Sequence, residues 1–134
     1  MNCYKLTDST MRTYGGKPWL LGEWVKASGL AGEPLCTSSW IHAYEHPLLA
    51  VLHNPIHSNY APPRLFVAEG RGEVLRDGQM KLGVRELRLV EELSVPPVTL
   101  RARVAYGVLA ARGVLPVGVS PVWDTWAAQW LLAG

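Results

Sequence analysis

The stretch RLFVAEGRGEVLRDGQMKLGVRELRLV, from Arg64 to Val90, decides the fold of this chain. Near its middle stands Asp77-Gly78, a dipeptide typical of tight hairpin turns because both residues tolerate a positive φ. The alternation of apolar and polar residues around this turn predicts strands at 64–69, 72–76, 80–83 and 84–90. Gly70-Arg71-Gly72 is interpreted as the turn between the first two strands. The stretch therefore predicts an antiparallel meander.

The sequence before the meander predicts short strands and one helix. The strands are expected at 1–6, 19–25 and 38–42. A helix begins at Pro47, where the missing N–H costs nothing, and it is expected to end at Asn54 because Pro55 disfavours continuation. Its predicted buried stripe consists of Leu48, Leu49, Leu52 and Ile56.

Two helices are predicted after Pro96-Pro97. Thr99 is the expected N-cap of the first helix and Gly113 its stop. The stripe predicted to be buried on this helix consists of Leu100, Val104, Val108 and Ala111. Ser120 caps the last helix, which carries Asp124 in its first turn. The expected fold class is therefore α+β: a mainly antiparallel sheet with a short helix after the His-bearing strand and two C-terminal helices packed against it.

Length and composition favour one globular domain over residues 1–134. Hydrophobic residues make up 49% and charged residues 18%, which excludes general disorder. Thirteen basic against 11 acidic residues exclude a general polyanion binder, so nucleic acid could bind only through a local basic patch. No apolar run reaches the roughly 20 residues of a membrane span. The expected location is the cytoplasm, where Cys3 and Cys36 stay reduced.

All four histidines lie close together in the sequence, just after Cys36. His42 and His46 are spaced i,i+4, and so are His53 and His57, a spacing that suits zinc on a helix. His42 to His46 also match the H-x-x-E-H pattern of inverzincin metalloproteases, but Pro47 interrupts the helix which that motif needs. A structural metal held by Cys36 and several of these histidines is the alternative. The favoured interpretation gives the rings a role in helix capping and backbone hydrogen bonding, and no metal or cofactor is predicted.

Aromatic and basic side chains suggest two kinds of interaction surface. Six Trp are many for 134 residues, and they either fill the core or form a partner-binding face. The predicted partner-binding residues are Trp19, Trp24, Trp123, Trp126 and Trp130. Basic residues gather in the meander at Arg64, Arg71, Arg76, Lys81, Arg85 and Arg88. Because acidic residues interleave with them, a solvated mixed-charge face is favoured over nucleic-acid contact.

Four stretches together resemble an uncharacterised family of small bacteriophage and prophage proteins. They are CYKLTD, LCTSSWIHAYEHPLLAVLHNPIH, PRLFVAEGRGEV and MKLGVRELRLVEEL. The resemblance covers about residues 1–93 and implies an accessory protein that binds and inhibits or modulates a host protein complex, such as RNA polymerase or a defence nuclease.

The predicted order of elements is also similar to that of small ADP-ribosyltransferase-like domains. This second resemblance implies that His42 holds a nicotinamide ribose, that Tyr44 stacks on the ring, and that Glu86 stands at the position of the catalytic acid. It makes a nucleotide-handling enzyme the first alternative to a docking protein. A metal-stabilised structural module is the second alternative.

Overall fold

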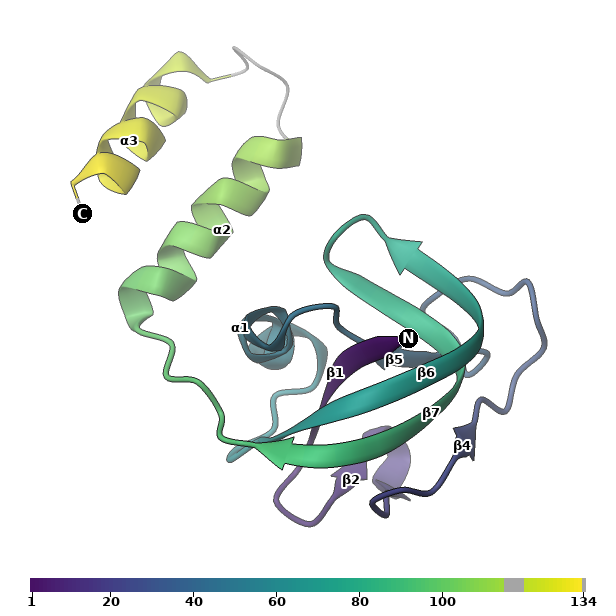
Figure 1. Cartoon of the computed structure of the whole chain (residues 1–134). Helices are drawn as coiled ribbons and strands as arrows, with labels where there is room; N and C mark the ends of the chain where they lie inside the picture. The colour runs from purple at the N-terminus through teal and green to yellow at the C-terminus, as the bar shows by residue number, and fades with distance from the viewer. Residues whose placement is uncertain (115–119, 134) are drawn as a thin grey trace. The chain divides into compact units, whose positions relative to one another are not determined.

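The chain forms two compact units in a computed structural model, which describes residues 1–114 and 120–133. Unit 1 spans Met1–Pro96 and unit 2 spans Pro97–Gly134. Unit 1 contains the antiparallel sheet and one α-helix, whereas unit 2 contains two α-helices (Figure 1). The predicted α+β class is confirmed. That residues 1–134 act as a single domain stays a prediction.

Unit 1 consists of seven strands and one α-helix, together with a short 3₁₀-helix at Tyr14–Gly16. The strands are β1 (Asn2–Thr7), β2 (Arg12–Thr13), β3 (Lys17–Pro18), β4 (Val25–Lys26), β5 (Ile41–Ala43), β6 (Arg64–Asp77) and β7 (Lys81–Leu93), and the helix is α1 (Pro47–His57). The main sheet has the order β1-β6-β7-β4, with β5 also paired to β7. Strands β2 and β3 form a separate small hairpin.

The meander is one long hairpin rather than four short strands. The predicted turn after Asp77 is confirmed: Gly78 has a φ of 53°, and the amide of Met80 donates to the carbonyl of Asp77 at 3.0 Å. The predicted turn at Gly70-Arg71-Gly72 is wrong, because β6 runs straight through it. Its extra residues form a bulge opposite β7, where Gly72 takes a φ of 83°. A bulge bends a strand without ending it.

The sheet closes on itself. Strand β5 pairs with β7, and Tyr44, directly after β5, exchanges two backbone hydrogen bonds with Tyr4 of β1 at 2.7 and 2.9 Å. The ring β1-β6-β7-β5 thus returns to β1. We call this arrangement the closed sheet. Its interior is filled by Cys3, Trp19, Ile41, Ala43, Phe66, Ala68, Leu82, Val84, Leu87 and Leu89.

Two predicted strands are displaced. Residues 19–24 are not a strand: a single bridge joins Leu21 to Leu89 of β7, and Gly22 then turns the chain with a φ of 80°. Strand pairing with β7 resumes only at Val25, the first residue of β4. The strand expected at 38–42 is shifted to Ile41–Ala43. The cause lies in the preceding turn, where Thr37 bonds through its hydroxyl to the carbonyl of Pro34 at 2.8 Å and so prevents extended pairing.

Helix α1 begins at Pro47 as predicted but extends beyond Asn54, through Pro55, to His57. A proline removes one helical hydrogen bond, and one further turn survives because its end is held elsewhere: Asn54 bonds to the backbone of Tyr60. The predicted buried stripe is only partly confirmed, because Leu49 and Leu52 are half-buried and Leu49 packs against the core. Leu48 and Ile56 are exposed, and the buried residues are Ala50, Val51 and His53. The face with Ala50 packs on Leu6, Tyr44 and Leu65.

Unit 2 consists of α2 (Leu100–Val114) and α3 (Pro121–Leu132). The predicted caps are confirmed: the hydroxyl of Thr99 accepts from Ala102 at 3.1 Å, and that of Ser120 accepts from Trp123 at 3.4 Å. Of the stripe predicted on α2, only Val108 is buried, and Leu100 and Val104 are exposed. No helix in the described part of the chain is long and apolar enough to cross a membrane.

Candidate functional site

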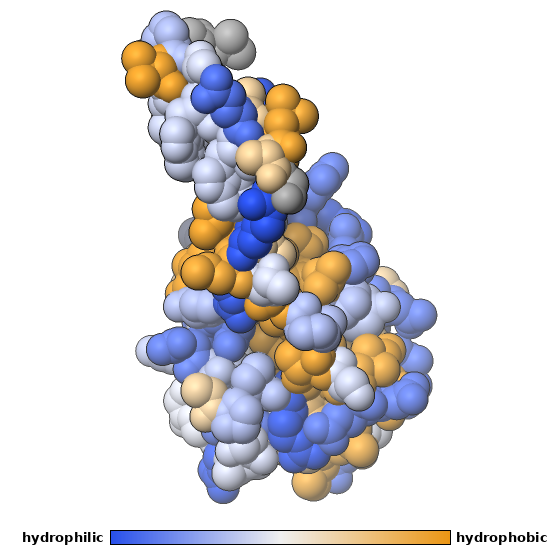
Figure 2. Space-filling model, turned by 90° about the vertical axis from the view of Figure 1, so that its left-hand side faces the viewer, coloured by the Kyte–Doolittle hydropathy of each residue, from blue (hydrophilic) through white to orange (hydrophobic). Residues whose placement is uncertain are grey.

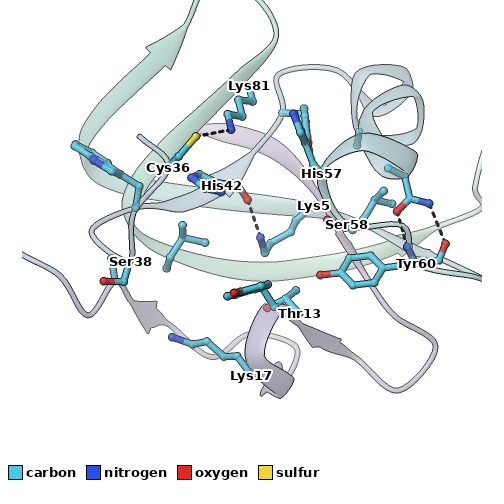
Figure 3. Close-up of a pocket in the computed structure, with 18 of the residues that line it drawn as sticks. Lys5, Thr13, Lys17, Cys36, Ser38, His42, His57, Ser58, Tyr60 and Lys81 are labelled. Atoms are coloured by element: carbon cyan, nitrogen blue, oxygen red, sulfur yellow. Dashed lines mark hydrogen bonds between the residues drawn. The ribbon is translucent and has the colours of Figure 1, made fainter. Parts of the chain in front are cut away.

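A cavity of about 690 Å³ lies within unit 1 (Figure 3). Its wall combines β1, β5 and the start of β7 with the segment around the 3₁₀-helix, the residues after β4, the loop before β5, and α1 with the residues that follow it. Pockets of roughly 300–1,000 Å³ are typical of small-molecule sites. The cavity is therefore large enough for a small organic ligand.

Lys5 is a buried cation in the wall of this cavity. It lies on β1, its residue is 9% exposed, and its Nζ donates to the carbonyl of His42 at 2.7 Å. The same nitrogen stands 5.3 Å from the ring centre of Trp19. Burial is the main cause that lowers the pKa of Lys5 from 10.5 to about 8. The amine therefore exchanges its proton much closer to neutral pH than an ordinary lysine does.

The charged groups that line the cavity share one sign. Lys5, Lys17 and Lys81 contribute ammonium groups, and none of the described lining residues is acidic. His42 and His57 add imidazole rings, whose pKa values are lowered by burial. Charge of one sign around a concave, partly apolar surface focuses the electrostatic field. The cavity thus attracts anions.

His42 is held in a defined orientation by its neighbours. Its Nε2 bonds to the carbonyl of Leu35, and because a carbonyl only accepts, this nitrogen carries the proton. Burial is the largest cause that lowers the pKa of His42. The ring is therefore neutral at pH 7, with Nδ1 left as an acceptor.

Tyr44, His53 and His57 form a stack of parallel rings beside the cavity. The rings of His53 and His57 lie 4.9 Å apart, and those of Tyr44 and His53 lie 5.5 Å apart. The hydroxyl of Tyr44 bonds to Nδ1 of His57 at 2.6 Å. Burial lowers the pKa of both imidazoles, so a neutral His57 accepts this bond. The pair can move a proton at the cavity wall.

The residues of the alternative metal site, Cys36, His42, His46, His53 and His57, do not form a metal-binding group. His46 caps α1, since its Nδ1 accepts from the amide of Leu48 at 3.2 Å. Cys36 is exposed, and Nζ of Lys81 lies 3.2 Å from its Sγ. In the described ranges 1–114 and 120–133, no three His, Cys, Asp or Glu side chains form a group that could hold a metal ion.

The constellation implied by the ADP-ribosyltransferase resemblance is only partly assembled. His42 and Tyr44 both line the cavity, but Glu86 is not among the lining residues. Glu86 pairs instead with Arg71, whose guanidinium lies 2.6 Å away and lowers the pKa of that carboxyl. The cavity therefore contains the histidine and the tyrosine without this acid.

The five tryptophans predicted to bind a partner are divided between the two units. Trp19 is buried in the closed sheet, and its Nε1 donates to the hydroxyl of Thr13 at 2.9 Å. Trp24 lies against two guanidinium groups, at 3.9 Å from Arg71 and 5.0 Å from Arg88. The other three, Trp123, Trp126 and Trp130, are on α3 of unit 2, where Trp126 is exposed and its two neighbours are half-buried.

Each basic side chain of the meander has a partner within unit 1. Four arginines form ion pairs: Arg64 with Glu92, Arg71 with Glu86, Arg76 with Glu45 and Arg88 with Glu69. Arg85 donates to the carbonyls of Gly29 and Ser39, and Lys81 contacts Cys36. These contacts fit the mixed-charge face favoured from the sequence.

Sequence reasoning missed Lys5, Lys17 and Tyr60 as members of a site. One signal was available for Lys5, because Cys3 and Lys5 occupy alternate positions of the first predicted strand and so share a face. A lysine on the apolar face of a strand indicates a buried charge.

Comparison of the chain with protein-family models, curated proteins and solved structures finds no match.

Proposed function

We propose that unit 1 is a binding module for a small organic anion, which enters the cavity of the closed sheet. The observation that carries this proposal is the set of ammonium and imidazole groups around a 690 Å³ cavity with no acid among its described lining residues. A buried cation without a carboxylate partner is costly to maintain. A bound anion offsets that cost.

The rest of the lining suggests the character of the ligand. Trp19, Trp40 and Tyr60 add aromatic surface next to the ammonium groups. Such a wall favours a ligand with a planar or apolar body as well as a phosphate or carboxylate group.

The experiment is a calorimetric titration of the whole chain with a panel of anions: inorganic phosphate, AMP, NAD and small carboxylates. We expect an organic anion to bind and to weaken as salt rises. A ligand at 100-fold its Kd should also stabilise the fold by about 2.7 kcal/mol. Lys17→Gln and Lys81→Gln should each weaken binding about tenfold.

Lys26→Gln is the matched control, because Lys26 is exposed and does not line the cavity. Its affinity should equal that of the unmodified protein. The proposal is wrong if no member of the panel binds, or if the three variants bind alike. Preferential binding of NAD or AMP would support the nucleotide-handling alternative, to which the cavity contributes His42 and Tyr44.

A second candidate function is docking on a host protein complex in the cytoplasm, as the phage resemblance implies. The observation in its favour is apolar surface on the helices of unit 2, where Leu109, Val122, Trp126 and Leu132 are all exposed. Figure 2 shows hydrophobic side chains at the surface among hydrophilic ones. Exposed apolar side chains of this kind are typical of interaction sites when they are contiguous.

The test is co-purification from a host lysate, followed by reconstitution with the identified partner. Val122→Ser and Trp126→Ser should each weaken the reconstituted complex at least tenfold. Leu30→Ser is the control, since Leu30 is equally exposed but lies in unit 1. Unchanged binding of both unit 2 variants would count against docking through these helices.

A further inference from the structure

We infer that Lys5 is a nucleophile that condenses with a carbonyl group of the bound anion to form an imine. The ligand class is therefore an anionic carbonyl compound, meaning an aldehyde or ketone that also carries a phosphate or carboxylate. The inference rests on the proposed function in one respect, because the cavity must admit the ligand.

The position of Lys5 suits this role. It lines the cavity, and its Nζ is fixed by the bond to the carbonyl of His42 at 2.7 Å. A neutral amine can keep that bond with one hydrogen and still has a lone pair for attack. Three of the four lysines in the chain line the cavity: Lys5, Lys17 and Lys81. Of these three, only Lys5 is buried. A desolvated lysine is the usual form of an imine-forming amine.

The surroundings of Lys5 favour a neutral amine. The titratable groups that face it are Cys3 on its own strand, Lys17 on β3 and His42 on β5. Burial raises the pKa of Cys3 to about 11 and lowers that of His42, so both are neutral near pH 7. Lys17 repels a second positive charge. No charged acid is among these groups, and the pKa of about 8 leaves about a tenth of the amine unprotonated at pH 7, far more than in an ordinary lysine.

The reaction needs no oxidant or reductant. The lone pair of Nζ attacks the carbonyl carbon, a C–N bond forms, and the electron pair of the C=O bond moves to oxygen. A proton passes from nitrogen to that oxygen and gives a carbinolamine. Protonation of the hydroxyl then lets it leave as water, and the nitrogen lone pair forms the C=N bond. The Tyr44–His57 pair lines the same cavity and can supply and recover the proton.

The anionic group of the ligand has separate partners. Lys17 and Lys81 line the cavity without being buried, so their side chains can bind a phosphate or carboxylate while Lys5 reacts. This division of roles distinguishes an anionic carbonyl compound from a neutral aldehyde.

The experiment traps the imine on the unmodified protein. Pyridoxal 5′-phosphate, or propionaldehyde as the neutral probe, is added with sodium cyanoborohydride, and peptide mass spectrometry measures the labelling rate of every lysine and of the N-terminal amine. At pH 7.5 we expect Lys5 to react at least tenfold faster than the exposed Lys26. The Lys5 rate should level off near pH 9, one unit above its pKa of about 8.

The outcomes separate the two proposals. Labelling of Lys26 as fast as Lys5 overturns the imine inference, whatever the anion titrations show. Fast labelling of Lys5 by both probes alike supports the amine but removes the anionic ligand class. Lys5→Arg provides a second test, because it keeps the positive charge and lacks a nucleophilic amine. It should lose the fast-labelling site while Lys26 is labelled at its usual rate. Fast labelling that persists at another amine of the cavity would assign the reaction to that amine and overturn the inference.

Discussion

Lys5 is a charged residue at a buried position of β1. Its neighbours two positions away, Cys3 and Thr7, are both fully buried, so the pleat directs Lys5 inward as well. The ammonium group of Lys5 is stabilised by the backbone carbonyl of His42 and by the ring of Trp19, not by a carboxylate. These partners stabilise an ammonium less than an ion pair would, and the pKa of about 8 follows from that weakness.

The pH dependence of stability tests this account. Below pH 8 Lys5 is charged in both the folded and unfolded states, and above pH 10.5 it is neutral in both. Between these limits the unfolded state binds more protons, so the Lys5 contribution to the free energy of unfolding rises with pH. Relative to Lys5→Met, the unmodified protein should gain up to about 3 kcal/mol across this range.

Urea unfolding of both proteins from pH 7 to 10.5 provides the measurement. The comparison is needed because Cys3, whose pKa is raised from 9.0 to about 11, acts in the opposite direction above pH 9. Burial, the largest cause of the raised Cys3 pKa, is present in both proteins, so most of the Cys3 effect cancels in their difference. A difference that does not change with pH would show that the Lys5 amine is not desolvated.

The hydrogen bond between Tyr44 and His57 gives a second residue-level prediction. Tyr44→Phe keeps the ring in its stack but leaves Nδ1 of His57 without this donor, so the free energy of unfolding should fall by about 1 kcal/mol. Tyr14→Phe is the control, because Tyr14 is 97% exposed and its hydroxyl faces water. Chemical denaturation of the two variants should separate them, and equal stability would mean that the bond contributes nothing.

At the scale of elements, β7 is the strand on which unit 1 depends. It pairs with β6, β4 and β5, and a bridge joins it to Leu21. Gly83 of β7 is paired with His42 of β5 in the antiparallel sheet. A Cβ at this glycine would stand 2.5 Å from Cδ1 of Leu35 and 2.7 Å from Cβ of Trp40. The close approach of the loop before β5 therefore requires a glycine.

Gly83→Ala should destabilise unit 1 by about 1–3 kcal/mol, because the added methyl group overpacks this contact. Thermal unfolding measures the loss. Gly107→Ala on α2 is the control, since a Cβ there meets nothing within 4 Å and alanine favours a helix. If Gly83→Ala unfolds at the same temperature as the unmodified protein, the loop does not pack as described.

At the scale of the whole molecule, the site and the helices of unit 2 belong to different parts of the chain. Every described residue that lines the cavity lies between Lys5 and Lys81, within unit 1. In unit 2, by contrast, only Val108 and Ala127 are buried among the described residues. Two helices with so little burial lack the apolar contact that usually stabilises a helix pair.

A fragment that ends at Pro96 should therefore fold and keep the cavity. We expect it to unfold cooperatively and to bind the same anions as the whole chain within a factor of about two. The fragment 97–134 should show low helicity by circular dichroism at micromolar concentration. Failure of the fragment 1–96 to fold would show that unit 2 is required for the stability of unit 1.

Local sequence patterns predict much of this architecture. The Asp77-Gly78 turn, the opening strand, the start of α1 at Pro47 and the caps at Thr99 and Ser120 all depend on residues a few positions apart. Dipeptide turns and capping side chains act through contacts within one turn of chain. These features were predictable for that reason, and so was the α+β class that follows from them.

Closure of the sheet and assembly of the cavity depend on contacts between distant segments. Tyr4 meets Tyr44 only because β5 pairs with β7, and Lys5 reaches the carbonyl of His42 only after that closure. The same packing buries the face of α1 that carries Ala50 and leaves the face that carries Leu48 exposed. Apolar periodicity shows which residues can be buried, but the partner that buries them comes from elsewhere in the chain. The lining residues of the cavity extend from Lys5 to Lys81, so no local sequence pattern brings them together.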